Sequence, residues 1–287
     1  MKKTIISCVL FLTAVTAFSQ TPMKTAAEAK LSASDLAVKI ADRILATTTY
    51  EFKNTKTGKT YKSVKNLPLD MNVKVACKYN NWHYTNGVTH IALMELADKT
   101  GAKKYDDYVL KNMNFVFNEG NLDFFKKQYE QAMKNEGWYG VRKLSWHMIF
   151  RGKRLDDNGP MGASLIDLQI KHPNNSFLNY INETAEHLNY GEPRLADGTI
   201  ARIWPHENTI WADDAFMAIS FLARMAKMTG DMSYINDAAN QVIKYHKYLW
   251  CPEKRILYHC YHTDTDEHGV AHWSRANCWV FMATADL

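Results

Sequence analysis

The sequence predicts an all-α fold built from helical hairpins, and two observations support this. Apolar residues recur with helical spacing along most of the chain; Ala215, Ile219 and Leu222, for example, share one face of a helix. A short unit also repeats: an apolar periodic segment, a Gly or Pro break, an aromatic residue and a second periodic segment. Helical pairs of this kind stack into a solenoid or close into an α/α toroid, and the loops at one end of a toroid surround a cavity.

The repeated unit is clearest in two segments. Leu96–Gly101 ends in Thr-Gly and is followed by Tyr105, and Met225–Gly230 ends in Thr-Gly and is followed by Tyr234. A third unit breaks at Pro173 and is followed by Phe177. Because Gly and Pro end helices, each unit should be two helices joined by a tight turn, with the aromatic residue packing the second against the first.

This pattern places the secondary structure in order along the chain. Helices are predicted at 33–47, 83–99, 103–119, 121–135, 160–172, 175–189, 212–228, 232–249 and 276–287. Short extended stretches are expected near 141–151 and 255–262. No run of Pro, Gly or Ser marks a linker, so residues 20–287 should form one domain. The last predicted helix is apolar and has no Gly, Pro or polar cap, so we expect this domain to continue beyond Leu287.

The first 19 residues have the pattern of a signal peptide. Two lysines precede the apolar run Ile5–Phe18, and Ala17-Phe18-Ser19 supplies a small-x-small cleavage site. The mature chain should therefore begin at Gln20 and be exported to the periplasm or the medium. The apolar run is too short for a transmembrane helix, and nothing downstream is long enough.

Charge and composition exclude one class of partner. The formal net charge is +5, and loss of the two leader lysines leaves about +3, which is too weak to argue for nucleic-acid binding. Aromatic residues make up 12% of the chain, which fits either a sugar-contacting protein or a large helical core.

The four cysteines of the mature chain are too few for a disulfide framework, and we expect buried free thiols at Cys77, Cys251, Cys260 and Cys278.

Polar and aromatic residues with catalytic or sugar-binding chemistry gather in four segments, each just before an apolar periodic run and hence at a predicted helix N-terminus. These segments are Asn81–Gly87, Leu155–Gly162, Ile203–Asp214 and His272–Trp279. Two of them carry Asp-Asp pairs, Asp156-Asp157 and Asp213-Asp214. Such acids serve as helix caps or first-turn charges. Two pairs in apolar, aromatic surroundings also suggest partly buried carboxylates, which have raised pKa values and can act as general acids.

The same segments resemble the motifs of the unsaturated glycuronyl hydrolases, glycoside hydrolase families 88 and 105. Trp211–Met217 is similar to the central motif of that family, and Trp273–Trp279 to its Trp-Gly-Arg-Gly/Ala-Asn-Gly-Trp motif. Trp82–Gly87 resembles its Trp-x-Tyr-Thr-Asn-Gly motif, and Leu155–Gly162 its Asp-rich turn. The motifs occur in the same order along the chain, and family 105 fits best.

The resemblance implies an (α/α)6 toroid, with more helices than the ranges above supply, and a hydration reaction. The substrate would be a lyase-generated oligosaccharide, of rhamnogalacturonan type most directly, with a C4=C5 enol ether in its terminal unsaturated uronate. The enzyme would protonate C4 and add water at C5, and the resulting hemiketal would collapse to release a keto-deoxy-uronate. No cofactor or metal is implied. One carboxyl group can perform both steps, unlike the two-carboxylate arrangement of ordinary glycosidases.

Individual roles follow from the matching positions. The resemblance implies that Asp213 is the acid/base, that Asp156 holds sugar hydroxyls and tunes Asp213, and that Asp214 is a cap or a supporting group. Arg275 would bind a carboxylate or hydroxyl, since its guanidinium can form paired hydrogen bonds. Further substrate contacts are implied at Trp211, Trp273, Trp279, Tyr84 and His259. The three tryptophans could equally be core residues.

Three positions depart from the family pattern. Arg202 stands where a relative carries a histidine, and we still count it among the substrate-binding residues. Ser274 and Cys278 replace glycines.

Other readings stay open at the sequence level. A polysaccharide lyase on the same toroid would use a Tyr or His base, and an inverting glycosidase would need both Asp156 and Asp213. A helical glycan-binding protein would tolerate the loss of Asp213. His259, His262, His268 and His272 could suggest a metal site, but their spacing is loose.

Overall fold

The computed structural model describes residues 32–152 and 154–287, and the chain divides into two compact units, residues 1–43 and 44–287. The signal peptide predicted for residues 1–19 lies outside the described residues. Helix α2 (Ala33–Thr47) begins in the first unit. It is capped reciprocally, because the Asp35 backbone N–H donates to Ser32 Oγ and the Ser32 backbone N–H donates to Asp35 Oδ2.

The second unit is predominantly helical, which confirms the predicted fold class. Its helices are α3 (Tyr84–Thr100), α4 (Lys104–Val116), α5 (Glu119–Val141), α6 (Met148–Arg151), α7 (Leu155–Lys171), α8 (Asn175–Glu186), the π-helical turn η2 (His187–Gly191), α9 (Ala212–Thr229), α10 (Met232–Leu249) and α11 (Ser274–Ala285). In the described part of the chain, no helix combines the length and the apolar character that a membrane span needs.

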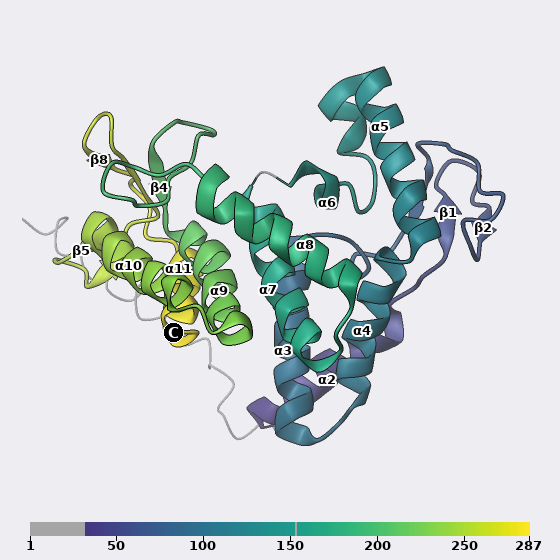
Figure 1. Cartoon of the computed structure of the whole chain (residues 1–287), viewed down its shortest axis with the longest axis horizontal. Helices are drawn as coiled ribbons and strands as arrows, with labels where there is room; N and C mark the ends of the chain where they lie inside the picture. The colour runs from purple at the N-terminus through teal and green to yellow at the C-terminus, as the bar shows by residue number, and fades with distance from the viewer. Residues whose placement is uncertain (1–31, 153) are drawn as a thin grey trace, which may run out of the picture. The chain divides into compact units, whose positions relative to one another are not determined.

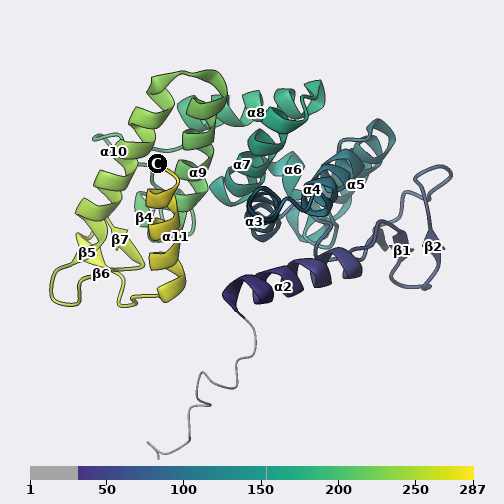
Figure 2. The ribbon, with the colours of Figure 1, turned by 90° about the horizontal axis from the view of Figure 1, so that it is seen from below.

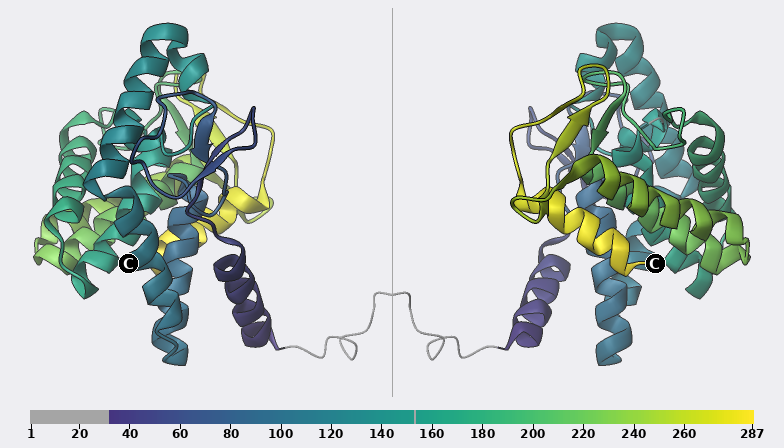
Figure 3. Two further views of the ribbon diagram at one scale, coloured as in Figure 1. Left: turned by 90° about the vertical axis from the view of Figure 1, so that its right-hand side faces the viewer. Right: turned by 90° about the vertical axis from the view of Figure 1, so that its left-hand side faces the viewer.

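Helices adjacent in sequence form hairpins, as the repeats predicted. Helix α3 packs on α4, α7 on α8, and α9 on α10, while α7 lies between α3 and α9 (Figure 1). Helices α10 and α11 both contact α9 and lie side by side (Figure 3). Helices α7 and α9 are therefore the central pair of this unit, and most of the residues of each are buried.

The predicted Thr-Gly breaks end their helices. Gly101 and Gly230 follow α3 and α9 with φ of 70° and 75°, a left-handed conformation that glycine adopts without steric cost. The aromatic residues of the repeats pack as expected at Tyr105 and Phe177, which are buried, whereas Tyr234 is only half-buried.

Glycines of the sequence motifs set the spacing between the central helices. A Cβ atom at Gly159 of α7 would lie 1.9 Å from the Met217 carbonyl oxygen of α9. A Cβ atom at Gly87 of α3 would lie 2.3 Å from the Pro160 carbonyl carbon of α7. Both distances are far below van der Waals contact, so α3, α7 and α9 approach closely only because these residues lack side chains.

Short strands connect the helices. Strands β1 (Phe52–Asn54), β2 (Thr60–Tyr61) and β3 (Val73–Val75) form an antiparallel sheet in the order β2-β1-β3. A second sheet has the order β4-β7-β8, from β4 (Thr209–Trp211), β7 (Cys260–His262) and β8 (Glu267–His268). Strands β5 (Trp250–Cys251) and β6 (Ile256–Leu257) form a hairpin, and they lie with β7 at the C-terminal end of α10 (Figure 2).

The extended stretch expected near 255–262 is confirmed by β6 and β7, but the one expected near 141–151 is wrong. That segment holds the end of α5, a run of turns and the short helix α6. Its apolar residues Leu144 and Trp146 alternate with polar ones as in a strand. Both side chains are buried, but the backbone there forms turns, and Trp146 has a positive φ of 67°. The four cysteines of the described chain are free thiols: Cys251 and Cys260 are buried as expected, whereas Cys77 is half-buried and Cys278 is exposed.

Candidate active site

Asp213 and Asp214 occupy the first turn of α9, directly after strand β4. Trp211 precedes the helix in an extended conformation (φ −115°, ψ 131°) and forms no side-chain cap. Carboxylates are favoured there by the free N–H groups and the positive end of the helix dipole. Consecutive side chains on a helix point about 100° apart, and the two carboxylates consequently meet different partners.

Asp213 is buried and contacts one cation and one histidine. Its Oδ1 accepts from Arg275, with 3.1 Å to Nε and 3.0 Å to Nη2. Its Oδ2 lies 3.1 Å from His259 Nε2, but this contact lacks hydrogen-bond geometry, and Oδ2 has no hydrogen-bond partner among the described residues. Asp213 thus has one oxygen anchored by Arg275 and one buried oxygen that faces the imidazole of His259.

The β4–β7 pairing brings His259 to this position. Trp211 is paired with Cys260, and the Ala212 backbone N–H donates to the His259 carbonyl oxygen at 2.9 Å. Burial lowers the pKa of His259, although the nearby Asp213 opposes this effect. The imidazole is therefore neutral at neutral pH.

Aromatic rings flank His259. Trp273 stacks on the imidazole with ring centres 4.3 Å apart, and Trp211 lies 4.8 Å from it. The Arg275 guanidinium lies over the Trp273 ring at 4.8 Å. Trp273 is 47% exposed, so part of its indole remains open to a ligand, whereas Trp211 is also covered by Arg202 at 4.2 Å.

Asp214 is held by Arg202 and does not act as a helix cap. Arg202 donates from Nε to Oδ2 at 2.7 Å and from Nη2 to Oδ1 at 2.6 Å, the paired geometry of a strong ion pair. Burial raises the pKa of Asp214 to about 6, and Arg202 works against that rise. Arg202 Nη2 also lies 3.5 Å from Asp156 Oδ2, so this arginine bridges α9 and α7.

Asp156 and Asp157 likewise differ in their surroundings. Asp157 is fully buried, and both of its oxygens accept from Arg151. The backbone carbonyl of Asp157 accepts from Trp82 Nε1 at 2.8 Å. Burial raises the pKa of Asp157, and Arg151 opposes the rise. Asp156 keeps 35% of its side chain exposed, so Asp156 is the carboxylate of this pair that can touch a ligand.

Tyr84 and Trp279 form a separate aromatic cluster with Phe216. Trp279 stacks on Phe216 with ring centres 5.1 Å apart, and Tyr84 meets Trp279 edge-on at 6.4 Å. Phe216 is three residues after Asp213, so it lies on the same side of α9. The structure therefore places these two predicted residues beside the Asp213 turn.

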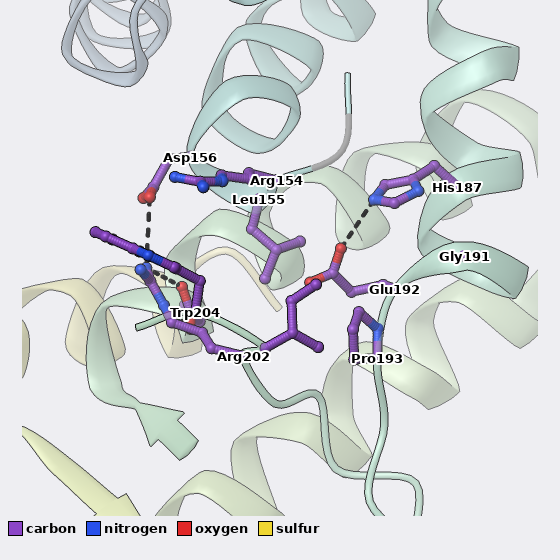
Figure 4. A pocket seen from close by; sticks show the side chains of 11 residues that line it. Arg154, Leu155, Asp156, His187, Gly191, Glu192, Pro193, Arg202 and Trp204 are labelled. Carbon is purple, nitrogen blue, oxygen red and sulfur yellow. Dashed lines mark hydrogen bonds and ion pairs between the residues drawn. The ribbon is translucent and has the colours of Figure 1, made fainter. Parts of the chain in front are cut away.

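A cavity of about 160 Å³ opens beside Asp156 and Arg202 (Figure 4). Its lining residues are Arg154, Leu155, Asp156, His187, Gly191, Glu192, Pro193, Arg202, Ile203, Trp204 and Asp214. Trp204 belongs to one of the four motif segments, whereas Arg154, His187 and Glu192 were not predicted as site residues. The spacing of His187 and Glu192 matches no common pairing pattern, because they meet across the π-helical turn η2. His187 Nε2 lies 2.9 Å from Glu192 Oε2.

The four histidines considered for a metal do not converge. His259 contacts Asp213, whereas His268 and His272 each lie against Tyr258 with ring centres 4.3 Å apart. His262 lies instead beside His206, with ring centres 5.9 Å apart. Within residues 32–152 and 154–287, no group of three or more His, Cys, Asp or Glu side chains could hold a metal ion.

Known proteins match this chain in both sequence and fold. The sequence profile of Glycosyl Hydrolase Family 88 matches residues 56–287. The unsaturated rhamnogalacturonyl hydrolase YesR of Bacillus subtilis (strain 168) is 25% identical over 193 residues, which cover 60% of this chain and 54% of that protein. The resemblance drawn from the four motifs is thereby confirmed.

Solved structures show the same fold. A possible member of the GH105 family from Klebsiella pneumoniae subsp. pneumoniae MGH 78578 has a TM-score of 0.57 at 14% identity, covering 90% of this chain and 59% of that one. A family 105 glycoside hydrolase of C. acetobutylicum ATCC 824 has a TM-score of 0.55 at 22% identity, with 77% and 55% covered. The GH76A α-1,6-mannanase of Salegentibacter sp. HEL1_6 has a TM-score of 0.54 at 14% identity, with 88% and 64% covered.

These likenesses confirm the predicted α/α-toroid class. The chain spans between about half and two thirds of the length of each of these four relatives.

Proposed function

The chain belongs to glycosyl hydrolase family 88, and from this we propose that it removes the unsaturated uronic acid from the non-reducing end of lyase-generated oligosaccharides. Rhamnogalacturonan-type fragments are the favoured substrates, because the curated relative YesR is an unsaturated rhamnogalacturonyl hydrolase. The reaction is hydration of the C4=C5 enol ether, as the sequence motifs imply.

One observation carries this proposal: the two oxygens of the buried Asp213 carboxyl group have different surroundings. Arg275 fixes Oδ1, while Oδ2 has no hydrogen-bond partner among the described residues and faces the neutral His259 at 3.1 Å. A carboxyl group held in this way can present a proton from Oδ2 to an alkene carbon without changing its orientation. The same oxygen can then take a proton from the attacking water.

The reaction proceeds by proton transfer, water addition and collapse of the hydrated uronate. Asp213 gives its proton to C4, and a water oxygen bonds to C5 as the water proton returns to the Asp213 carboxylate. The resulting hemiketal opens by breaking the bond between C5 and the ring oxygen, which takes up the hydroxyl proton and leaves a ketone at C5 and a hemiacetal at C1. The hemiacetal then loses the leaving sugar from C1 as its hydroxyl proton passes to the glycosidic oxygen, which yields a keto-deoxy-uronate and a shortened oligosaccharide. Burial of Asp213 strengthens each electrostatic interaction along this path.

Neighbouring residues hold the substrate. Arg275 keeps 53% of its side chain exposed, so its remaining N–H groups can reach a uronate carboxylate. Asp156 can accept hydrogen bonds from sugar hydroxyls, and the open part of Trp273 can cover a sugar ring.

A digest made by a polysaccharide lyase tests the proposal. Incubation with the chain should remove the ultraviolet absorbance of the conjugated double bond and release a shortened sugar. A rise in absorbance on intact polysaccharide would identify a lyase instead. Binding without any change in absorbance would identify a glycan-binding protein.

We also propose that the chain is exported through residues 1–19, because their charged start, apolar run and small-residue site form a signal peptide. When the full chain is expressed in a bacterium, the product should be found outside the cytoplasm. Its mass should be that of a chain beginning at Gln20. An intact chain that begins at Met1 and stays in the cytoplasm would contradict this.

A further inference from the structure

The excess positive charge of the chain is concentrated in residues 51–78, which form β1, β2, β3 and the loops between them. This segment, called the basic sheet below, contains seven lysines and two acidic residues, an excess of five. The formal net charge of the whole chain is also +5, so the rest of the sequence is balanced. A cluster of one sign creates a local potential that concentrates opposite charge around it.

Most lysines of the basic sheet are exposed and have no opposing charge. Five of them occur at every third position from Lys53 to Lys65, and all five are exposed. Among the described residues, the side chains of Lys53, Lys59, Lys62 and Lys65 form no ion pair. These ammonium groups are therefore available to an anion from outside the chain.

One of the two acidic residues is already occupied within the sheet. Asp70 Oδ1 accepts from the backbone and the side chain of Asn72, both at 2.8 Å, and Oδ2 accepts from Asn54 Nδ2 at 3.0 Å. The hydrogen bonds from Asn72 lower the pKa of Asp70, and the nearby Lys56 adds to this effect. Asp70 thus stays ionised and offsets Lys56, but its oxygens are committed to amide groups.

The register of the sheet brings two lysines together. Lys53 of β1 is the direct cross-strand partner of Lys74 of β3, and like charges in this position destabilise a sheet. Lys74 Nζ donates to the Lys143 carbonyl oxygen at 3.1 Å, which satisfies a hydrogen bond but leaves the positive charge. A bound anion would relieve the repulsion between Lys53 and Lys74.

The lysines are displayed on a fixed platform. Asn54 Oδ1 accepts from the backbone N–H groups of Lys56 and Thr57, both at 3.0 Å, which holds the turn after β1. On the buried face of the sheet, Phe52 lies with its ring centre 5.7–5.8 Å from those of Phe115, Phe124 and Phe125. The exposed charges can therefore meet a ligand without ordering the backbone first.

The basic sheet is separate from the candidate active site. Figures 1 and 2 both show β1 and β2 beside α5, away from α9 and α11, which carry Asp213 and Arg275. A ligand that contacts both places must be long, and the sheet can bind such a ligand without taking part in the reaction.

The composition of the basic sheet favours an acidic polysaccharide among polyanions. The segment has no arginine, the residue best suited to paired hydrogen bonds with the phosphates of nucleic acids. Within residues 51–78, Leu69 is the one large apolar residue that is exposed, at 41%, whereas binding to a membrane surface uses a larger apolar face. Dispersed lysines suit a hydrophilic chain with carboxylates at intervals.

We propose that the basic sheet binds an acidic polysaccharide through the carboxylates of successive uronic acids. It would hold the chain on the polymer from which a lyase releases the substrate, and so raise the local concentration of that substrate. The choice of a polysaccharide rests on the proposed function, whereas the charge of the surface does not.

Titration calorimetry with polygalacturonate at physiological salt tests this proposal. Lys53→Gln, Lys59→Gln and Lys62→Gln, made together in the full chain, should weaken binding by about 3- to 100-fold, the loss expected from three exposed ion pairs. Arginine at the same three positions should preserve binding because it keeps the charge. Added salt should weaken binding of the wild type more than binding of the glutamine variant.

A matched control removes the same charge elsewhere. Lys99→Gln, Lys227→Gln and Lys254→Gln, made together, change three exposed lysines outside the basic sheet and should leave binding unchanged. Equal weakening by the two triple variants, or unchanged binding by the first, would overturn the proposal. Equally tight binding of uncharged dextran would overturn it as well, and so would tighter binding of single-stranded DNA or of anionic lipid vesicles.

Turnover separates this proposal from the proposed function. Polygalacturonate has no unsaturated end, so its binding does not require the reaction. The first triple variant should hydrolyse an unsaturated disaccharide with the wild-type kcat/KM, and a large loss would overturn the proposal by showing that the lysines act on the active site. If the wild type hydrolyses no unsaturated oligosaccharide but binds the polymer through these lysines, the proposed function fails and the surface assignment holds. Hydrolysis without this binding would overturn the surface assignment alone.

Discussion

Asp213 and Asp214 are neighbours in the sequence, yet their carboxylates have separate partners. Both oxygens of Asp214 accept hydrogen bonds from Arg202, at 2.6 Å from Nη2 and 2.7 Å from Nε. Asp213 is anchored by Arg275 through a single oxygen. The other oxygen of Asp213 faces His259. A fully paired carboxylate suits a structural role, and a carboxyl group with one free oxygen suits proton transfer.

The contact between α7 and α9 yields the first prediction. Gly159→Ala should lower the free energy of unfolding by about 1–3 kcal/mol or more, the usual cost of overpacking, because the new Cβ would lie 1.9 Å from the Met217 carbonyl oxygen. Helix propensity alone would favour alanine by about 1 kcal/mol, so the sign of the effect is diagnostic. Urea unfolding measures it.

A second glycine serves as the control for this change. Gly120 is exposed in the first turn of α5, where an added Cβ would meet only the Val64 side chain at 3.3 Å and the Asn118 side chain at 3.5 Å. Gly120→Ala should have little effect. Equal stability of the two variants would show that α7 and α9 do not need this close approach.

The Arg202–Asp214 pair yields the second prediction. Asp214→Leu alone should cost about 3–5 kcal/mol of unfolding free energy, because it leaves the largely buried Arg202 without its main partner. Adding Arg202→Met should recover much of this loss, since replacing a whole buried pair by apolar residues is often neutral. A double-mutant cycle measures the coupling. Additive costs of the two single changes would show that the pair contributes no specific interaction.

His90 yields a prediction about pH and stability. Burial lowers the pKa of His90 to about 4, and neither ring nitrogen has a hydrogen-bond partner among the described residues. In the unfolded chain the pKa is about 6.5. Between these values the unfolded state binds more protons, so the free energy of unfolding falls as the pH is lowered from about 6.5 towards 4.

His90→Leu should remove this part of the pH dependence. The wild type should lose about 2 kcal/mol more than the variant between pH 7 and pH 5, as measured by urea unfolding at both values. The matched control is His206→Leu, at an exposed histidine, which should keep the wild-type difference. If His90→Leu and the wild type lose the same amount, His90 is not held neutral in the fold.

Much of the helical framework could be predicted from the sequence, because it depends on local periodicity and on the chemistry of turns. The helices expected at 33–47 and 232–249 have the predicted bounds, and Gly101 and Gly230 end their helices as expected. The small sheet of β1, β2 and β3 was missed because strands of two or three residues are too short to show alternation.

Part of the candidate site could be assembled from the sequence motifs, but the pairing of its side chains could not. The motif positions of Asp213, His259 and Arg275 come together in the structure. Arg202 pairs with Asp214 because the segment before β4 approaches α9. No local sequence pattern predicts this approach. The same holds for Arg154 and Trp204, which are far apart in the sequence and meet only across the cavity.

The role of Asp213 is the central claim, and Asp213→Asn tests it most directly. The substitution keeps the shape of the side chain and removes its acid/base function, which typically costs about 10²- to 10⁴-fold in rate. The matched control is Asp264→Asn, at an exposed aspartate of the loop after β7.

The measurement is the rate at which each variant removes the double-bond absorbance of an unsaturated uronyl oligosaccharide. We expect wild-type rates from Asp264→Asn and near-complete loss of turnover from Asp213→Asn, with the substrate still bound. Turnover by Asp213→Asn within a few-fold of the wild-type rate would contradict the assignment of Asp213 as the proton donor.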